Sequence, residues 1–261
     1  MTTFSLGRIA FILFCALVLL YLILPVLIIV PMSFSGARFL TFPPPSLSLR
    51  WYQEYLSNSG WMQATRVTAT VAVLTVLIAT PLGVAAAYAI SNSKLRIMRL
   101  IHMALLLPLV VPIIITAVGI LFVYARVGLV ATMSGLVLAN VMLGLPYVVI
   151  SVVAGLQSFD AAQEMVARSL GMNRLRSFFI VTLPQIKASV LAGAIFAFIS
   201  AMDETVVGLF ISGGQYQPLT KRTFTALRDE IDPTIAAIST LMTAASFMLV
   251  LIASTRQKRT A

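Results

Sequence analysis

The amino-acid sequence predicts an all-α integral membrane protein with six transmembrane helices and both termini on the cytoplasmic side. The 261 residues are 60% hydrophobic and only 10% charged, whereas soluble domains carry about 25% charged residues. The mean hydropathy is +1.01. Six apolar segments are long enough to cross a bilayer, which takes about 20 residues. Lysine and arginine are also distributed unequally between alternate connecting segments.

The same composition excludes several other classes of protein. So much apolar surface is incompatible with a soluble domain or a disordered chain. No G-x-x-x-x-G-K-[ST] stretch is present to hold a nucleotide phosphate. One histidine and one cysteine, Cys15, do not make a metal-ligand set, and no nucleophile–base pair is visible. We therefore expect a chain that is not an enzyme and binds no metal or cofactor itself.

The first three predicted spans cover residues 9–32, 64–90 and 103–124. The first is too long for the apolar core of a signal peptide. The loop after it carries aromatic side chains that suit a membrane–water interface. These are Trp51, Tyr52, Tyr55 and Trp61. The third span contains Pro108 and Pro112, and proline is able to bend a membrane helix.

The remaining predicted spans cover residues 130–156, 188–211 and 234–253. Residues 157–187 are more polar and form a predicted cytoplasmic loop. The loop between the last two spans mixes both signs of charge, and a basic tail follows the sixth span. These charged residues are Lys221, Arg222, Arg228, Asp229, Glu230, Asp232, Arg256, Lys258 and Arg259. We treat residues 1–261 as one transmembrane domain.

The distribution of basic residues orients these spans. Six crossings place both termini on the same side of the membrane. With the N-terminus inside, eleven lysines and arginines lie inside and seven outside. The inside residues also occupy shorter segments close to the helix ends. Because cytoplasmic loops collect Lys and Arg, both termini are predicted to be cytoplasmic.

The segment 160–184 is the most informative part of the cytoplasmic loop. Asp160 suits a helix N-cap, and Glu164 suits the positive end of the helix dipole. Apolar side chains recur at helical spacing until Gly171, which is able to adopt a positive φ and end the helix. A second helical stretch is expected to end at Leu183-Pro184. The apolar stripe then lies either on lipid headgroups or in a groove of a soluble partner.

This segment resembles the EAA loop of ABC-transporter permeases, whose pattern is E-A-A, three residues, G, nine residues, I-x-L-P. Ala167, Gly171, Leu183 and Pro184 match this pattern. Val181 stands where the pattern has Ile, and Val166 replaces its first Ala. Met165 occupies the position of its Glu, and Glu164 precedes that position by one residue. The resemblance implies that this loop meets a separate ATPase through Glu164, Met165, Ala167, Gly171, Leu183 and Pro184.

The resemblance extends over most of the chain, through residues 51–90, 107–112, 201–214 and 227–241. These segments are similar to permeases of the spermidine/putrescine type. The likeness implies a type I importer in a bacterial inner membrane. Its partners would be a second, distinct permease, two ATP-binding subunits that hold ATP and Mg²⁺, and a periplasmic solute-binding protein. Membrane lipid surrounds such a chain, and nucleic acid is not an expected partner.

Asp203 and Glu204 lie inside the fifth predicted span. A charge near the bilayer centre costs at least about 2.5–3.5 kcal/mol. Either the two acids lie near the outer end, solvated or paired with the second permease, or one of them attracts a cationic substrate along the translocation path. Such a substrate is a polyamine or another amine-bearing solute, such as 4-aminobutyrate or an amino acid. A self-sufficient secondary transporter would also use intramembrane acids but would not need the EAA-like loop.

Overall fold

The computed structural model describes residues 6–229 and 232–258. The regular secondary structure of this part of the chain is helical, and one isolated bridge joins Ser35 and Leu47. The structure divides into two units, one of Met1–Met62 with Thr225–Ala245 and the other of Gln63–Phe224 with Ser246–Ala261. Glu230, Arg259 and residues 1–5, on which parts of the charge and terminus predictions fall, lie outside the described residues.

The first unit contains α1 (Leu6–Ser33) and the short α2 (Arg50–Ser57). The predicted first span is therefore helical. The aromatic loop after it contains a helix that was not predicted, and Trp51 and Tyr55 are buried on one face of this helix. Tyr52 on the same helix hydrogen-bonds to the Ser33 hydroxyl over 2.7 Å. Trp51, Tyr55 and Trp61 are thus buried inside the protein, and the position of these aromatics at a membrane–water interface stays a prediction.

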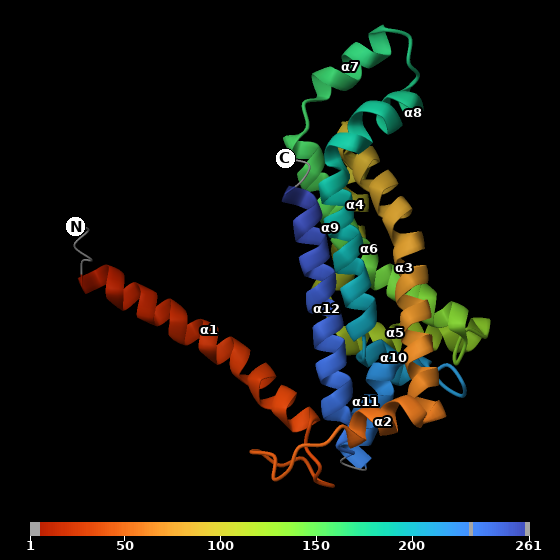
Figure 1. Ribbon diagram of the computed structural model, residues 1–261. Helices are drawn as coiled ribbons and strands as arrows, with labels where there is room; N and C mark the ends of the chain where they lie inside the picture. Colours follow the sequence, from red (N-terminus) through yellow and green to blue (C-terminus); the bar gives the residue numbers. More distant parts are fainter. Residues whose placement is uncertain (1–5, 230–231, 259–261) are drawn as a thin grey trace. The chain divides into compact units, whose positions relative to one another are not determined.

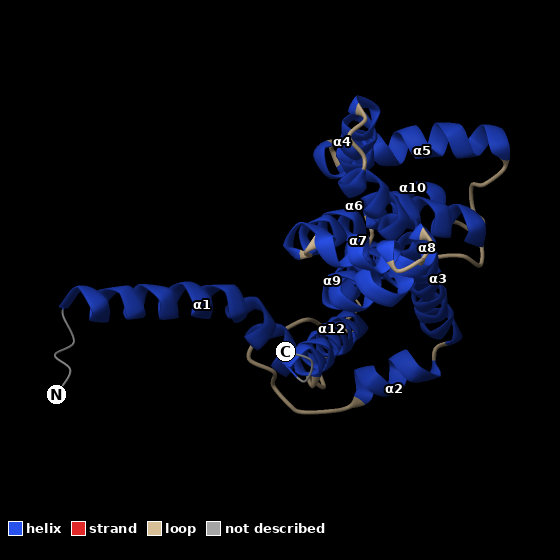
Figure 2. Ribbon diagram, turned by 90° about the horizontal axis from the view of Figure 1, so that it is seen from above, coloured by secondary structure: helices blue, strands red, loops and turns tan. Residues whose placement is uncertain are grey.

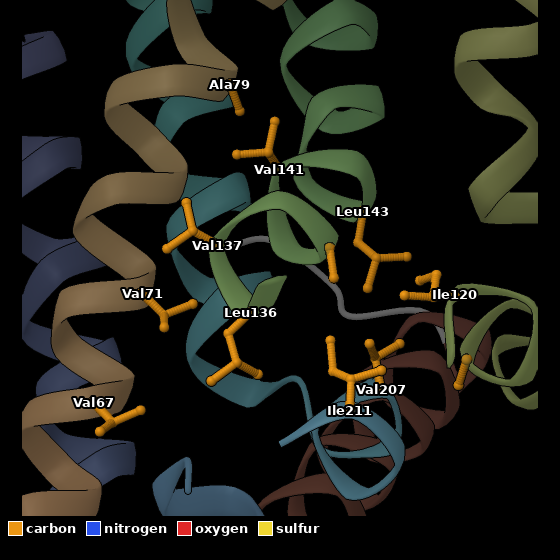
Figure 3. Packing of buried hydrophobic residues seen from close by; sticks show 12 residues of the cluster. Val67, Val71, Ala79, Ile120, Leu136, Val137, Val141, Leu143, Val207 and Ile211 are labelled. Carbon is orange, nitrogen blue, oxygen red and sulfur yellow. The ribbon is translucent and has the colours of Figure 1, made fainter. Parts of the chain in front are cut away.

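The second unit is built around long apolar helices. α3 (Ser59–Asn92) enters this unit at Gln63, and α6 (Met133–Ser158) and α9 (Leu183–Asp203) lie beside it (Figure 1). Figure 3 shows buried aliphatic side chains from α3, α6 and α10 (Val206–Ile211) packed into one cluster. Its most buried members include Leu136, Val207 and Ile211. This apolar cluster packs α10 against α3 and α6 at one end of the unit.

The third predicted span is not one continuous helix. α4 (Arg96–Val110) and α5 (Ile113–Val127) are bent by 107° at a short break. Figure 2 shows α5 lying across the view while α4 is seen nearly end-on. Val111 is extended because it precedes Pro112, and Pro112 has no N–H to continue the helix. Pro108 stays inside α4, so only the second of the two prolines produces the break.

The fifth predicted span is also broken. α9 ends at Asp203, Glu204 is extended, and α10 begins at Val206. At the other end, α8 (Arg174–Ser177) continues through the π-helix η1 (Phe178–Thr182) directly into α9. The expectation that Leu183-Pro184 ends this helix is therefore wrong. The π-helical turn changes the backbone hydrogen-bond pattern directly before Pro184, so the chain continues into α9 although proline has no N–H to donate.

Four described helices are long and apolar enough to cross a membrane, or five if the bent α4–α5 pair is one span. The remaining helices are α7 (Ala161–Ser169), α11 (Leu219–Asp229) and α12 (Thr234–Lys258). In α12 the described apolar stretch is Thr234–Met248, which is shorter than a full membrane span. The sixth crossing and the side of the termini therefore stay predictions.

Candidate functional site

α7 is the helix of the EAA-like segment, and its ends are set locally as predicted. The Asp160 carboxylate accepts a hydrogen bond from the Ala162 N–H over 2.9 Å at the N-cap. The helix ends at Ser169, and Gly171 adopts a φ of +94°. Figure 1 shows α7 and α8 at one end of α3, α6 and α9, and α10 towards the other end. The segment thus extends beyond the membrane-spanning helices of its unit.

The two faces of α7 differ in exposure. Glu164 and Ala167 are buried, with 8% and 7% of their surface exposed. Met165, Val166 and Leu170 are 60%, 59% and 79% exposed. One turn of helix separates Glu164 from Ala167, so both point towards the chain's own helices. The apolar side chains are thus left open on the opposite face, which we call the outer face of α7.

The Glu164 carboxylate is held by hydroxyl groups from two other helices. The Tyr88 hydroxyl at the end of α3 donates to Oε1 over 2.5 Å, and the Thr182 hydroxyl in η1 donates to Oε2 over 2.8 Å. The Ser177 hydroxyl also donates to the Glu164 carbonyl oxygen over 3.3 Å. Both carboxylate oxygens are therefore satisfied within this chain, as a buried charge requires.

Sequence reasoning did not find Tyr88, Ser177 or Thr182. Their only signal is a polar side chain at the end of an apolar stretch, which most membrane helices also show. Of the two remaining motif residues, Leu183 packs against a buried cluster of apolar side chains, whereas Pro184 is exposed. The structure therefore brings Glu164, Ala167 and Leu183 towards the interior and leaves Met165, Gly171 and Pro184 at the surface.

A pocket of about 300 Å³ lies beside the two acids of the fifth predicted span. It is lined by Tyr147, Phe196, Ile199, Ser200, Asp203 and Glu204. The rings of Tyr147 and Phe196 are stacked, with their centroids 6.4 Å apart. Carboxylates and aromatic faces both attract organic cations. The aromatic pair, which sequence reasoning also missed, gives the acids an environment suited to an ammonium group.

Asp203 and Glu204 have different roles in this pocket. The Glu204 carboxylate accepts a hydrogen bond from the Val207 N–H over 2.7 Å, so it caps the first turn of α10. Asp203 is exposed at the last residue of α9. We expected the two acids to be neighbours on one continuous helix. The structure instead places the end of α9 between them. Both acids line the pocket, but Glu204 also caps a helix start, whereas Asp203 is exposed.

The fold and these two sites define a membrane transport subunit. Residues 79–259 match the family described as "Binding-protein-dependent transport system inner membrane component". Because this match covers more than half of the sequence, the chain belongs to that family. It is the permease component of an ABC importer and not an enzyme, as the sequence predicts.

Two relatives resemble the chain over most of its length. The spermidine/putrescine transport system permease protein PotC of Haemophilus influenzae is 29% identical over 239 residues, which are 92% of this chain and 93% of PotC. The putrescine transport system permease protein PotI of Escherichia coli is 29% identical over 229 residues, 85% of this chain and 81% of PotI.

The fold is also found in a solved structure. A bacterial ABC transporter involved in the import of the acidic polysaccharide alginate superposes with a TM-score of 0.75, covering 98% of this chain and 99% of the other. The sequence identity is 17%, so this likeness concerns the fold alone. It confirms the predicted ABC-permease fold.

Proposed function

We propose that this chain forms half of the translocation path of an ATP-driven importer for polyamines of the putrescine and spermidine kind. It would work in a bacterial inner membrane with a distinct second permease, two ATP-binding subunits and a periplasmic binding protein. The likeness to PotC, a spermidine/putrescine permease, and to PotI, a putrescine permease, supports the substrate class. The observation that carries the proposal is the pocket in which Asp203 lies beside two aromatic rings.

The chemistry of this pocket fits a cationic amine. Moving an ammonium group out of water is costly, and a carboxylate at short range lowers that cost by Coulomb attraction. Aromatic faces add cation–π attraction. The Glu204 carboxylate is held at the start of α10 by the Val207 N–H, whereas Asp203 is exposed beside the pocket. We therefore assign the direct contact to Asp203 and the support of the pocket wall to Glu204.

The outer face of α7 supplies the coupling to the ATPase in this proposal. Met165, Val166 and Leu170 are apolar and exposed at the end of the helix bundle. An apolar helix face of this kind suits a groove on a soluble partner. Gly171 and Pro184 lie at the surface near this helix, whereas Glu164, Ala167 and Leu183 act by holding α7 and η1 in position. ATP and Mg²⁺ would be bound by the partner subunits only.

The test is uptake of labelled putrescine and spermidine by cells that express the complete transporter, with and without this subunit. We expect uptake to depend on the subunit and to resist competition by unlabelled 4-aminobutyrate and amino acids. Asp203→Asn should raise KM on the order of tenfold, because it removes a charged partner of the ammonium group. Glu54→Gln, on the exposed surface of α2, is the control and should leave KM unchanged.

The same assay separates the two acids. Glu204→Gln keeps a side-chain oxygen that is able to cap α10, so its KM should stay within about threefold of the unmodified protein. Uptake that depends on the subunit but is competed by 4-aminobutyrate or an amino acid would refute the polyamine assignment. It would still support an importer, with that solute as its substrate. Wild-type KM for putrescine in Asp203→Asn would refute the role of Asp203.

A further inference from the structure

The position of Glu164 on α7 determines which side of the helix it serves. In this chain Met165 occupies the motif position of Glu, and Glu164 comes one residue earlier. Consecutive side chains on a helix are about 100° apart. Met165 is accordingly 60% exposed on the outer face, while Glu164 is 8% exposed and turned towards α3 and η1.

We propose that Glu164 is a positioning residue that fastens α7 to α3 and η1, so that a displacement of α7 is passed directly to the membrane helices of the same chain. The contacts that fasten it form the Glu164 cluster, which consists of Tyr88, Glu164, Arg174, Ser177 and Thr182. The proposal rests on the proposed function only in assigning the ATPase to the outer face of α7.

The hydrogen bonds of the cluster run through three segments of chain. The Arg174 Nε–H donates to the Tyr88 hydroxyl over 3.4 Å, and that hydroxyl donates to Glu164. The Arg174 guanidinium also lies 5.3 Å from the centre of the Tyr88 ring. A positive group behind a hydroxyl donor strengthens the bond that the hydroxyl makes to a carboxylate. Tyr88 therefore bridges a cation on α8 and an anion on α7.

The π-helix η1 completes the cluster from the other side. Thr182 is fully buried in the last position of η1, where its hydroxyl reaches Glu164. Phe178, at the first position of η1, packs edge-on against the Tyr88 ring with the centroids 4.7 Å apart. Isolated π-helical turns are frequently found at functional positions. Here the turn carries two side chains that touch the Glu164–Tyr88 pair, at the start of α9.

Outside the cluster, α7 makes one described side-chain hydrogen bond to another helix, from the exposed Gln185 amide of α9 to the Gln163 side-chain oxygen. Glu164 and Ala167 are its only buried residues in the described structure. A helix of 9 residues is too short to be stable alone in water. Hydrogen bonds to a charged group each shift an equilibrium about tenfold to a hundredfold, more than burial of one alanine methyl contributes. The carboxylate is therefore the dominant contact between α7 and the rest of its unit.

The first experiment measures whether α7 is fastened, independently of any transport. Ala167→Cys is introduced into a Cys15→Ser background, which removes the single native cysteine. The full-length chain, in membrane vesicles without the ATPase subunits, is labelled with a maleimide. Because Ala167 is buried beside Glu164, labelling should be slow. Tyr88→Phe, Thr182→Val or Glu164→Gln should each speed it about tenfold or more.

Two controls make this result specific. Val166→Cys on the outer face should react at the same fast rate in all of these backgrounds, because Val166 is already 59% exposed. Tyr21→Phe removes a hydroxyl from an exposed tyrosine of α1 and should leave the labelling of Ala167→Cys slow. Unchanged labelling of Ala167→Cys in Tyr88→Phe and Thr182→Val would overturn the proposal.

The second experiment measures coupling in the complete transporter, as solute imported per ATP hydrolysed. Tyr88→Phe should keep the ATPase subunits bound, because Tyr88 is not on the outer face, and should lower the ratio at least about threefold. Met165→Ser should instead release the ATPase. A Glu164→Gln variant that releases the ATPase, with Tyr88→Phe fully coupled, would place Glu164 against the ATPase and overturn the inference. Retention of the ATPase by Met165→Ser would contradict the proposed docking face alone, and the labelling result would stand.

Discussion

A close approach of α6 and α9 in the second unit gives a prediction whose size follows from the structure. Gly193 of α9 faces α6. A β-carbon at this position would lie 2.9 Å from the Val148 α-carbon and 3.2 Å from the Ser151 β-carbon. Carbon atoms in contact normally lie about 3.5–4.0 Å apart, so the shortfall against the Val148 α-carbon is about 0.6–1.1 Å. Because that atom is backbone, no side-chain rotation relieves the clash, and the two helices must separate.

We therefore expect Gly193→Ala to lower the free energy of unfolding. Overpacking of this kind costs about 1–3 kcal/mol, and small residues are what allow membrane helices to approach this closely. Alanine also stabilises the middle of a helix relative to glycine by about 0.5–1 kcal/mol. The net loss should therefore be about 0–2.5 kcal/mol.

Gly119 of α5 offers a matched control, because a β-carbon there would have no neighbouring atom within 4 Å. Gly119→Ala keeps the helix-propensity gain and lacks the clash. The difference between the two variants is thus the packing cost alone, about 1–3 kcal/mol. In a chain of this size that corresponds to a Tm difference of about 2–12 °C. The assay is thermal loss of helical circular dichroism of the purified protein in detergent. Equal Tm values for the two variants would refute the reasoning.

Three further predictions concern α7 and the topology. Gly171→Ala places a β-carbon at a φ of +94°, which costs about 1–3 kcal/mol; ATP-dependent uptake should fall while membrane insertion is unchanged. Asp160→Ala removes the N-cap of α7 and should destabilise that helix by about 1 kcal/mol, measured as faster maleimide labelling of Ala167→Cys, whereas Asp160→Asn should keep labelling slow. Reporter fusions at both termini should be active only with cytoplasmic reporters, and an active periplasmic reporter at either end would contradict the proposed topology.

The sequence alone determined the features that depend on local chemistry. The apolar composition showed that the chain is a membrane protein, because its long apolar segments have the length and hydropathy needed to cross a bilayer. The ends of α7 followed from Asp160 and Gly171, since capping side chains and positive φ values act within one helical turn. The EAA-like pattern gave the family of the chain, which the match over residues 79–259 confirms.

The tertiary structure decided where apolar segments break and which polar groups meet. Whether a proline breaks a helix depends on its surroundings: Pro112 separates two helices, whereas Pro184 follows a π-helical turn and the helix continues. Glu204 leaves the helix and caps α10, which separates its role from that of Asp203. Glu164 turns inwards to accept a hydrogen bond from Tyr88, which lies 76 residues earlier in the chain. No local pattern contains such a partner, because the pairing exists only once α3, α7 and η1 have packed together.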